Sequence, residues 1–324
     1  MLNIKYPFKR VLVTGGAGFI GTRIVNLLKE MGKEICVVDN LYIGRPMPES
    51  GPKILTFTED IGNQPVIEKI FKSFNPEVVI HLAAIHHIPT CEKNGPQAMQ
   101  TNVVGTQIIL DAAQTVHTKL CILASTGAVY QWDTGFLKED HTQTGACDNY
   151  SVTKLTNEQQ LKVWTQKTGS RGRIARLFNT IGHDDPNGHL IPDIMQQILD
   201  TPGNVEISLG NIKAKRDYIY VQDTAEGILS VLNDLRENIA LDTFNICTGM
   251  EFSVSDIVNE IGLILNKKIA ICIDEKRLRK LDRDSQLGDP TKSTQMLGFK
   301  ARYDFKNAIR QTITPFVEAF LLRK

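Results

Sequence analysis

A glycine-rich segment near the N-terminus has the spacing of a phosphate cradle. Gly16, Gly18 and Gly21 satisfy the pattern G-x-G-x-x-G directly after a short apolar run. Such glycines let the backbone approach a pyrophosphate closely, while a helix N-terminus supplies N–H donors. Asp39 follows Gly21 at close to the ~20 residues at which a carboxylate accepts hydrogen bonds from a ribose diol. The combination favours NAD over NADP, although Arg45 is near enough in the sequence to leave NADP open.

A tyrosine and a lysine, Tyr150 and Lys154, stand four positions apart, which places them on one face of a helix. A free phenol, with a pKa of about 10, is a poor base near neutrality. A neighbouring ammonium and the positive nicotinamide of NAD⁺ both stabilise the phenolate. The pair therefore predicts a proton acceptor for a sugar hydroxyl as hydride leaves its carbon. Ser125 and Thr126, at the end of an earlier apolar run, strengthen this interpretation of a common spacing.

The elements that must position these residues alternate regularly in the first half of the chain. We expect strands over 10–14, 34–38, 54–57, 78–81, 120–124 and 173–177, and helices over 19–31, 64–73, 98–115 and 150–168. Uniformly apolar short strands suit a parallel sheet that is covered on both faces. The alternation therefore predicts an α/β fold built on a doubly wound parallel sheet.

Beyond about residue 179 the alternation of strands and helices becomes less regular. Gly, Pro, Asn and Asp cluster over 182–188, which is typical of a loop. Further helices are expected near 189–200, 223–234, 253–266 and 305–322, and a strand near 217–221. We predict a cofactor-binding domain over 1–178 and a smaller α/β substrate-binding domain mainly over 179–324, with segments near 215–247 returning to the first. The basic run 276–280 is either a solvated face or an arginine clamp for a phosphate.

Composition excludes several classes of protein. The 324 residues hold 37 Lys and Arg against 36 Asp and Glu, so we expect no nucleic-acid partner. We expect no membrane association and no secretion, because no apolar run approaches the ~18 residues of a span and the N-terminus lacks a signal-peptide core. The six cysteines form no C-x-x-C pair, which predicts reduced thiols in the cytoplasm. We expect no metal site, since the adjacent His86 and His87 lack a third ligand at metal spacing.

In combination, ten short segments resemble the extended short-chain dehydrogenase/reductases of the nucleotide-sugar epimerase/dehydratase family, over nearly the whole chain. These segments are 14–21, 38–41, 60–61, 81–84, 101–106, 125–130, 150–154, 176–179, 216–221 and 287–292. The resemblance implies a Rossmann sheet, NAD as cofactor and a nucleotide-sugar substrate. It also implies a homodimer that pairs the helices near 98–115 and 150–168.

The resemblance assigns roles to individual residues. Thr126 would hydrogen-bond the reacting hydroxyl, Tyr150 would be the base, and Lys154 its partner. The residues that it implies around NAD are Gly15, Gly18, Phe19, Ile20, Gly21, Asp39, Asn40, Asp60, Ile61, Leu82, Ala83, Ala84, Asn102, Tyr150 and Lys154. Those implied around the nucleotide sugar are His87, Thr126, Asn179, Arg216, Arg279 and Asp282. Arginine suits this task because guanidinium binds phosphate bidentately.

The two positions after Thr126 separate the subclasses of the family. Dehydratases usually place Asp-Glu or a similar pair there, whereas this chain has Gly127 and Ala128, which cannot move a proton. We therefore predict an epimerase that abstracts hydride to form a 4-keto hexose. A nucleotide-sugar 4-dehydrogenase or 4-ketoreductase is the alternative. A 4,6-dehydratase would need an acid/base pair from elsewhere, for which the candidates are Cys147, Glu139, Asp140, His86 and His87.

The nucleotide base is left open between GDP and UDP. The segments 288–292 and 210–217 resemble the GDP-linked branch of the family slightly more, whereas Asp39-Asn40-Leu41 with Gly44 is common among UDP-sugar epimerases. A regulator that binds the cofactor without catalysis is disfavoured, because both Tyr150 and Lys154 are present.

Overall fold

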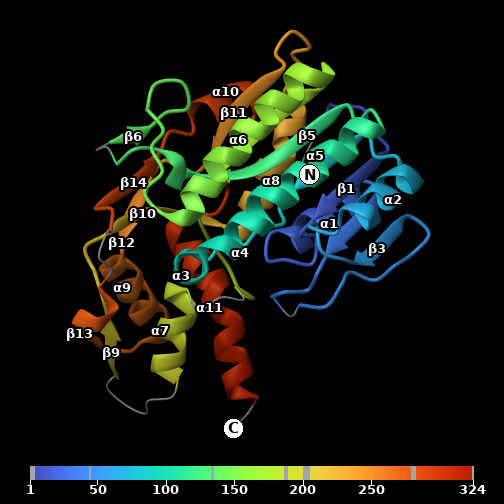
Figure 1. The fold of residues 1–324 in the computed structure, drawn as a ribbon. Helices are drawn as coiled ribbons and strands as arrows, with labels where there is room; N and C mark the ends of the chain where they lie inside the picture. Colours follow the sequence, from blue (N-terminus) through green and yellow to red (C-terminus); the bar gives the residue numbers. More distant parts are fainter. Residues whose placement is uncertain are drawn as a thin grey trace.

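A parallel sheet of seven strands forms the centre of the molecule (Figure 1). The computed structural model describes residues 4–43, 45–132, 135–185, 189–199, 205–278 and 282–322. In spatial order the strands are β11 (Leu241–Ile246), β7 (Arg171–Leu177), β5 (Leu120–Thr126), β4 (Val78–His81), β1 (Arg10–Thr14), β2 (Glu34–Asp39) and β3 (Ile54–Thr58). Each adjacent pair is parallel, so the expected doubly wound sheet is confirmed.

Helices cover both faces of this sheet because alternate residues of each strand point to opposite sides. The covering helices are α1 (Gly21–Glu30) and α8 (Val221–Ser230) on one face, and α2 (Gln64–Phe74), α5 (Gly105–Thr115) and α6 (Asn149–Thr168) on the other. In β1, Val11 and Val13 join the apolar cluster of the first face, whereas Leu12 joins that of the second. Burial on both faces explains why these strands are uniformly apolar in the sequence.

A π-helical turn divides the helix expected over 98–115. The chain forms α4 (Gly95–Met99), the π turn η1 (Gln100–Val104) and then α5. Asn102 lies fully buried within this turn. Its side chain accepts a hydrogen bond from the N–H of Ile85 (2.7 Å) and donates one to the carbonyl of Ile85 (2.9 Å). The turn thus anchors the loop that follows β4, as π turns often do near functional sites.

A second, smaller region forms around β10 (Lys215–Tyr220). The other strands are β6 (Phe136–Leu137), β8 (Asn179–Ile181), β12 (Glu251–Ser253) and β14 (Ser285–Gly288), with the separate pair β9 (Val205–Leu209) and β13 (Ile269–Ile273). Its helices are α7 (Leu190–Leu199), α9 (Val254–Leu265) and α11 (Phe305–Leu321), and its 3-10 turn is η4 (Glu275–Arg277). Of the other elements, α3 (Ile88–Lys93) packs against α4 and α6, η2 (Gly127–Val129) follows β5, and η3 (Val231–Asn233) and α10 (Thr291–Leu297) join the apolar core on the α1 and α8 face of the main sheet. Helices α7, α9 and α11 share one apolar core with β9 and β10. Within the described ranges, no helix is long and apolar enough to cross a membrane.

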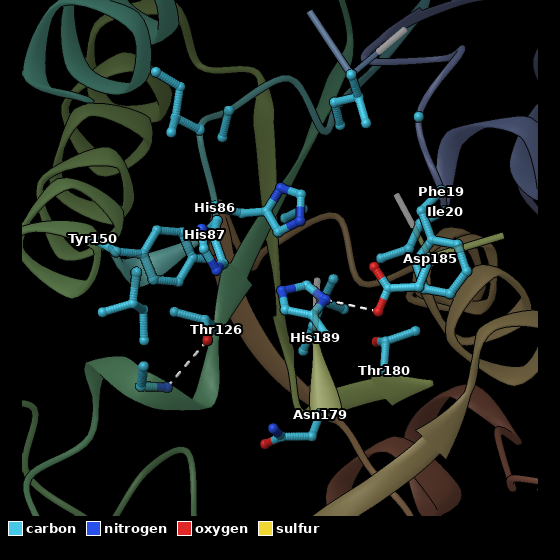
Figure 2. Close-up of a pocket in the computed structure, with 18 of the residues that line it drawn as sticks. Phe19, Ile20, His86, His87, Thr126, Tyr150, Asn179, Thr180, Asp185 and His189 are labelled. Atoms are coloured by element: carbon cyan, nitrogen blue, oxygen red, sulfur yellow. Dashed lines mark hydrogen bonds and ion pairs between the residues drawn. The ribbon is translucent and has the colours of Figure 1, made fainter. Parts of the chain in front are cut away.

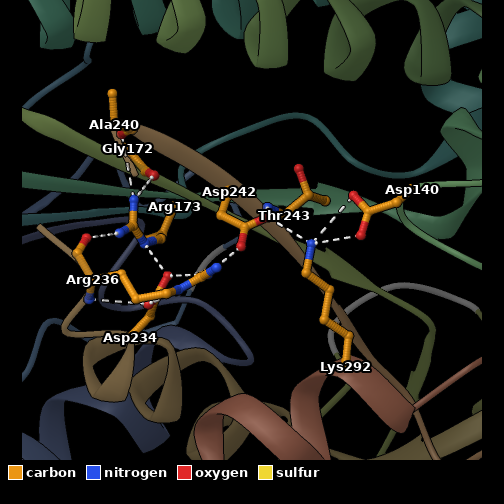
Figure 3. Close-up of polar contacts among 9 residues, drawn as sticks. All are labelled: Asp140, Gly172, Arg173, Asp234, Arg236, Ala240, Asp242, Thr243 and Lys292. Carbon is orange, nitrogen blue, oxygen red and sulfur yellow. Dashed lines mark hydrogen bonds and ion pairs between the residues drawn. The ribbon is translucent and has the colours of Figure 1, made fainter. Parts of the chain in front are cut away.

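A network of alternating charges joins β7, β11 and α10 (Figure 3). Arg173 Nε lies 2.8 Å from Asp234 Oδ2, and both side chains are at most 2% exposed. Arg236 bridges Asp234 and Asp242, and Lys292 Nζ lies 2.6 Å from Asp242 Oδ1. Each buried charge therefore has an opposite partner, which is what makes burial of the Arg173 guanidinium tolerable.

The network predicts a large effect of Asp234→Asn on stability. The substitution leaves the buried Arg173 guanidinium without its carboxylate, so we expect unfolding free energy to fall by about 3–5 kcal/mol. Urea denaturation followed by circular dichroism measures the change. Asp140→Asn is the control, because this side chain is 66% exposed where it meets Lys292 and we expect a loss below about 1 kcal/mol. Equal stability of the two variants would contradict the prediction.

Candidate active site

A crevice lies between β1 and β4, where the order in which the chain adds strands to the sheet reverses. β1 and β4 are neighbours, and the chain adds β2 and β3 on one side of them and β5, β7 and β11 on the other. Ligands of doubly wound folds bind at the carboxyl ends of the strands at such a switch point. A cavity of about 720 Å³ lies there, lined on one side by the glycine-rich turn and on the other by residues of the second region such as Arg216.

The glycine-rich turn needs glycine because backbone segments meet there. Gly15 has φ +70°, and a Cβ on it would lie 2.8 Å from the amide nitrogen of Ala83. A Cβ on Gly21 would lie 2.1 Å from the carbonyl oxygen of Gly15. Gly15, Gly18 and Gly21 line the cavity, whereas Gly16 packs against β2. The turn therefore has the cavity-lining spacing G-x-x-G-x-x-G, rather than the pattern that starts at Gly16.

Acidic and amide side chains form the edge of the cavity after β2. Asp39 Oδ2 accepts a hydrogen bond from the N–H of Ala17 (3.0 Å), and Oδ1 accepts one from Leu41 (2.8 Å). Asn40 Nδ2 donates to Asp60 Oδ2 (2.7 Å). These bonds hold the Asp39 carboxylate at the end of β2, where it suits the hydroxyls of a ribose and repels a 2′-phosphate.

Arg45, the residue that left NADP open, is held by the loop after β8. Its Nη1 donates to the carbonyl of Asp184 (3.0 Å), and its Nη2 lies 3.5 Å from Asp184 Oδ2. Arg23, on α1, approaches the same carboxylate at 3.5 Å and donates to the carbonyl of Phe19 (3.0 Å). The loop is therefore tied to the cofactor-binding helix, and its carboxylate offsets both cations.

A buried histidine supports the floor of the crevice. His81 Nδ1 lies 2.6 Å from Thr14 Oγ1, and its Nε2 lies 2.8 Å from Thr106 Oγ1. Burial lowers the pKa of His81 to about 3, so the ring is neutral at physiological pH. The Thr14 hydroxyl also accepts a hydrogen bond from the N–H of Ala83 (3.3 Å). These hydrogen bonds join the ends of β1 and β4 to α5. Nothing in the sequence pattern indicated that His81 stands at their centre.

The three expected catalytic residues meet at the cavity (Figure 2). Asp148 begins α6 with a capping box, in which its carboxylate accepts from Ser151 N (2.7 Å), and this places Tyr150 in the first turn. Burial raises the pKa of the Tyr150 phenol, and a hydrogen bond with Thr126 acts in the opposite direction. Lys154 Nζ donates to the carbonyl of Ala124 (2.9 Å) and lies 6.0 Å from the centre of the Tyr150 ring.

The surroundings of Lys154 leave a positively charged ammonium group beside Tyr150 at neutral pH. Burial lowers the pKa of the Lys154 ammonium to about 8, so it stays largely protonated at neutral pH. Beneath it, Glu158 Oε1 accepts from Ser125 Oγ (2.5 Å) and from Arg176 Nε (2.9 Å). This buried bridge fixes α6 against β5 and β7, and therefore fixes the height of Tyr150 above the strand ends.

The two positions after Thr126 carry no acid, and the first of them is closely packed. A Cβ on Gly127 would lie 3.0 Å from the ring of Phe178 and 3.0 Å from Gln286 Nε2. Ala128 lines the cavity and carries no proton-transfer group. The other candidates for a replacement acid, Cys147, Glu139 and Asp140, are not among the lining residues. Any proton-transfer group in addition to Tyr150 must therefore come from another part of the cavity wall.

A histidine cluster occupies that other wall (Figure 2). His86 and His87 follow β4, and His189 precedes α7. The ring centre of His189 lies 6.0 Å from that of His86 and 5.6 Å from that of His87. His189 Nδ1 lies 2.7 Å from Asp185 Oδ2. His87 was expected near the sugar from the sequence, whereas Asp185 and His189 were not. The four-residue spacing of Asp185 and His189 beside a Gly- and Pro-rich loop was the available signal.

Polar side chains of the second region form the far end of the cavity. Arg216 Nη2 donates to Asp282 Oδ1 (2.8 Å), and Asn211 Nδ2 donates to Asp282 Oδ2 (3.0 Å). Arg277, from the basic run, also lines the cavity and pairs with Asp193 at 2.7 Å. Two guanidinium groups thus stand where a phosphate could be bound bidentately.

Most of the expected site residues line this one cavity. They are Gly15, Gly18, Phe19, Ile20, Gly21, Asp39, Asn40, Asp60, Ile61, Leu82, Ala83, Ala84, His87, Thr126, Tyr150, Lys154, Asn179, Arg216 and Asp282. Asn102 differs, because it lies fully buried behind the wall and holds the backbone of Ile85. Arg279 lies outside the described residues.

Comparison with known proteins agrees with this geometry. The model of the NAD dependent epimerase/dehydratase family matches residues 11–247. The chain belongs to this family. It is 27% identical over 310 residues to the UDP-glucose 4-epimerase of Lactobacillus helveticus, covering 91% of this chain and 93% of that protein. It is 28% identical over 303 residues to the GDP-6-deoxy-D-talose 4-dehydrogenase of Aggregatibacter actinomycetemcomitans, covering 93% and 95%.

A solved structure supports the same assignment. The UDP-glucose 4-epimerase of Brucella ovis in complex with NAD superposes with a TM-score of 0.84 at 27% identity, covering 95% of this chain and 98% of that one. The dinucleotide fits the residues of this family member. Gly15 and Gly21 leave a cradle that a Cβ would fill, and Asp39 supplies the carboxylate for a ribose. When bound, NAD supplies the acceptor for a hydride.

The close approach at Gly21 predicts loss of NAD in Gly21→Ala. The added methyl group would overlap the Gly15 carbonyl, so the turn must open and the N–H donors must move away from the pyrophosphate. We expect affinity for NAD to fall by at least about tenfold, a change of about 1.4 kcal/mol in binding free energy. Isothermal titration with NAD measures it. Gly51→Ala is the control, because nothing lies within 4 Å of its Cβ position. Unchanged affinity in Gly21→Ala would show that the turn does not hold the dinucleotide.

Proposed function

We propose that this chain is an NAD-dependent nucleotide-sugar 4-epimerase that acts through a 4-keto hexose. The observation that carries the proposal is the meeting of Thr126, Tyr150 and Lys154 beside Gly127 and Ala128. The first three residues serve oxidation and reduction at a hydroxyl-bearing carbon. The last two provide no group for removing water, which a dehydratase of this family requires.

Each residue of the three has a distinct task in this reaction. Thr126 hydrogen-bonds the C4 hydroxyl and orients it toward Tyr150. Tyr150 acts as the phenolate, which the Lys154 ammonium stabilises, and its oxygen accepts the hydroxyl proton as hydride leaves C4. The same groups return the proton after the ketone has turned and hydride has reached its opposite face. Hydroxyl configuration at C4 is inverted, and no net redox change remains.

We propose a UDP-linked hexose as the substrate. UDP-glucose 4-epimerases are prominent among the relatives, including those of Lactobacillus helveticus and Brucella ovis. In this assignment residues 1–178 bind mainly NAD, and residues 179–324 bind mainly the nucleotide sugar. Arg216, oriented by Asp282, would contact the diphosphate, and Asn179 would contact the substrate beside the nicotinamide. Arg279 would join this group as a second diphosphate contact.

A GDP-linked 4-dehydrogenase is the second candidate. It is favoured by the similarity to the GDP-6-deoxy-D-talose 4-dehydrogenase, which covers 93% of this chain. Incubating the protein with NAD⁺ and UDP- or GDP-hexoses separates the two by NMR and mass spectrometry. An epimerase yields an isomer of unchanged mass, whereas a dehydrogenase yields a ketone lighter by two hydrogens together with NADH. A product lighter by one water would instead identify a dehydratase.

The mechanism predicts a large loss of turnover in Tyr150→Phe. Removing the phenol oxygen removes the proton acceptor, so kcat for interconversion of UDP-glucose and UDP-galactose should fall by about 10²–10⁴-fold. A coupled assay for UDP-glucose measures it. Tyr303→Phe is the matched control, because this tyrosine packs on Tyr220 and does not line the cavity. Normal turnover in Tyr150→Phe on the identified substrate would rule out the proposed base.

We further propose that the enzyme is a homodimer in the cytoplasm, where its six free cysteines stay reduced. Val104 on η1 and Val152 and Val163 on α6 are exposed apolar side chains. Pairing of α5 and α6 with those of a second copy would bury them in a four-helix bundle.

Val163→Glu tests this interface. A carboxylate in the apolar seam would face its own copy across the two-fold axis or lose its hydration, so we expect a monomer in size-exclusion chromatography with light scattering. Leu235→Glu is the control, because Leu235 is equally exposed in the turn after η3. A dimer that persists in Val163→Glu, or a monomeric wild type, would refute the assigned surface.

A further inference from the structure

The Asp185–His189 pair has the geometry of a general base. His189 Nδ1 lies 2.7 Å from Asp185 Oδ2, and the Asp185 side chain is only 6% exposed. A carboxylate on one ring nitrogen fixes the tautomer and stabilises the imidazolium, which leaves the other nitrogen to exchange protons. In Figure 2 the His189 ring stands between Asp185 and the wall that carries Tyr150 and Thr126. The pair therefore faces the space in which the reacting sugar must lie.

Two further histidines stand beside His189. Burial lowers the pKa of His86 to about 4, and the adjacent His189 contributes in the same direction. His86 is therefore neutral at physiological pH and places no positive charge beside the His189 ring. His87, on the other side, has Nδ1 within 2.9 Å of Thr90 Oγ1, which orients its ring toward the same wall.

We propose that His189, oriented by Asp185, is a second general base, which exchanges the proton on a carbon next to the C4 ketone. The inference rests on the proposed function, because the 4-keto intermediate is what makes the C3 and C5 protons acidic. His189 Nε2 takes the proton, and the C–H electron pair forms the enolate of the C4 carbonyl. The imidazolium then returns a proton to the same carbon. The step is redox-neutral and needs no further reactant.

The second base would extend the chemistry of the enzyme beyond C4. Gly127 and Ala128 provide no proton-transfer group, and His189 enters the cavity from a different loop on the opposite wall. Proton return to the same face exchanges the hydrogen with solvent, and return to the opposite face inverts C3 or C5. Substrates with a ketone at C4 are thus the class on which this activity acts.

Deuterium exchange on a supplied ketone tests the proposal without any oxidation step. The NAD-loaded protein is incubated in D₂O with UDP- or GDP-linked 4-keto-6-deoxyglucose, and proton NMR follows the C3 and C5 signals against an enzyme-free sample. We expect the wild type to exchange at least one of these protons. His189→Asn should slow the exchange by about 100-fold or more. Asparagine is chosen because its amide can still donate to Asp185, which preserves the contact that anchors the loop.

Two controls keep the result specific. His141→Asn, on an exposed loop, should exchange as the wild type does. Affinity of His189→Asn for UDP or GDP should stay within about threefold of the wild type, a difference of about 0.65 kcal/mol. Exchange that persists in His189→Asn would overturn the proposal. So would slow exchange accompanied by an equal loss of nucleotide affinity or thermal stability, because the residue would then be structural.

The outcome is independent of the test of the proposed function. A wild type that epimerises UDP-glucose but exchanges neither proton of either ketone overturns the second base and leaves the epimerase. A wild type that exchanges the ketone but neither epimerises nor oxidises any hexose keeps the second base and overturns the epimerase.

Discussion

The closeness of two backbone segments, at Gly15 and Gly21, sets the geometry on which the rest of the site depends. Any side chain on Gly21 would occupy the place of the Gly15 carbonyl, so α1 can begin directly above the end of β1 only with hydrogen at this position. The same turn is braced from the other side by Ala83, whose amide reaches the Thr14 hydroxyl. The glycine turn, the end of β4 and the loop after it therefore form one rigid unit, against which the opposite wall of the cavity is placed.

The side of the cavity that carries Tyr150 and Lys154 is also held by buried contacts, and these contacts limit the chemistry that we propose for it. Glu158 binds α6 to both neighbouring strands, and Phe178 closes the space beside Gly127. Tyr150 and Lys154 consequently have fixed positions with no partner acid at the strand end. The loops that carry His86 and His189, on another wall of the cavity, are the parts that can contribute additional proton-transfer groups.

Periodicity in the sequence was sufficient to predict the main sheet, because strands buried on both faces and helices with one apolar face leave strong patterns. It failed where structure depends on contacts that are distant in sequence. The π turn that divides 98–115 contains Asn102, which is bonded to Ile85 in another segment, and no local pattern indicates this contact. Strands of two to four residues, such as β6 and β14, are too short to show alternation.

The site was predictable to the extent that its residues lie in short fixed motifs. Gly15, Asp39, Tyr150 and Lys154 were expected and line the cavity. Asp185 and His189 were missed because they stand in a loop of Gly, Pro, Asn and Asp, where composition indicates a turn and conceals which side chains point inward. Their pairing depends on how the loop folds against α1 through Arg23, which is a tertiary property.

The loop around 183–185, which Arg23 connects to α1, also indicates how the substrate range of the protein could change during evolution. The residues that we propose for dinucleotide binding and hydride chemistry stand at strand ends, in the turns after them and on helices, whereas the histidine-bearing segments lie in loops or at their edges. Changes in these segments alter which face of a sugar meets a proton carrier without disturbing the sheet. An ancestral gene could therefore have acquired new substrates through a few loop codons, and a combinatorial library confined to 85–89, 183–185 and 189 would sample that same route.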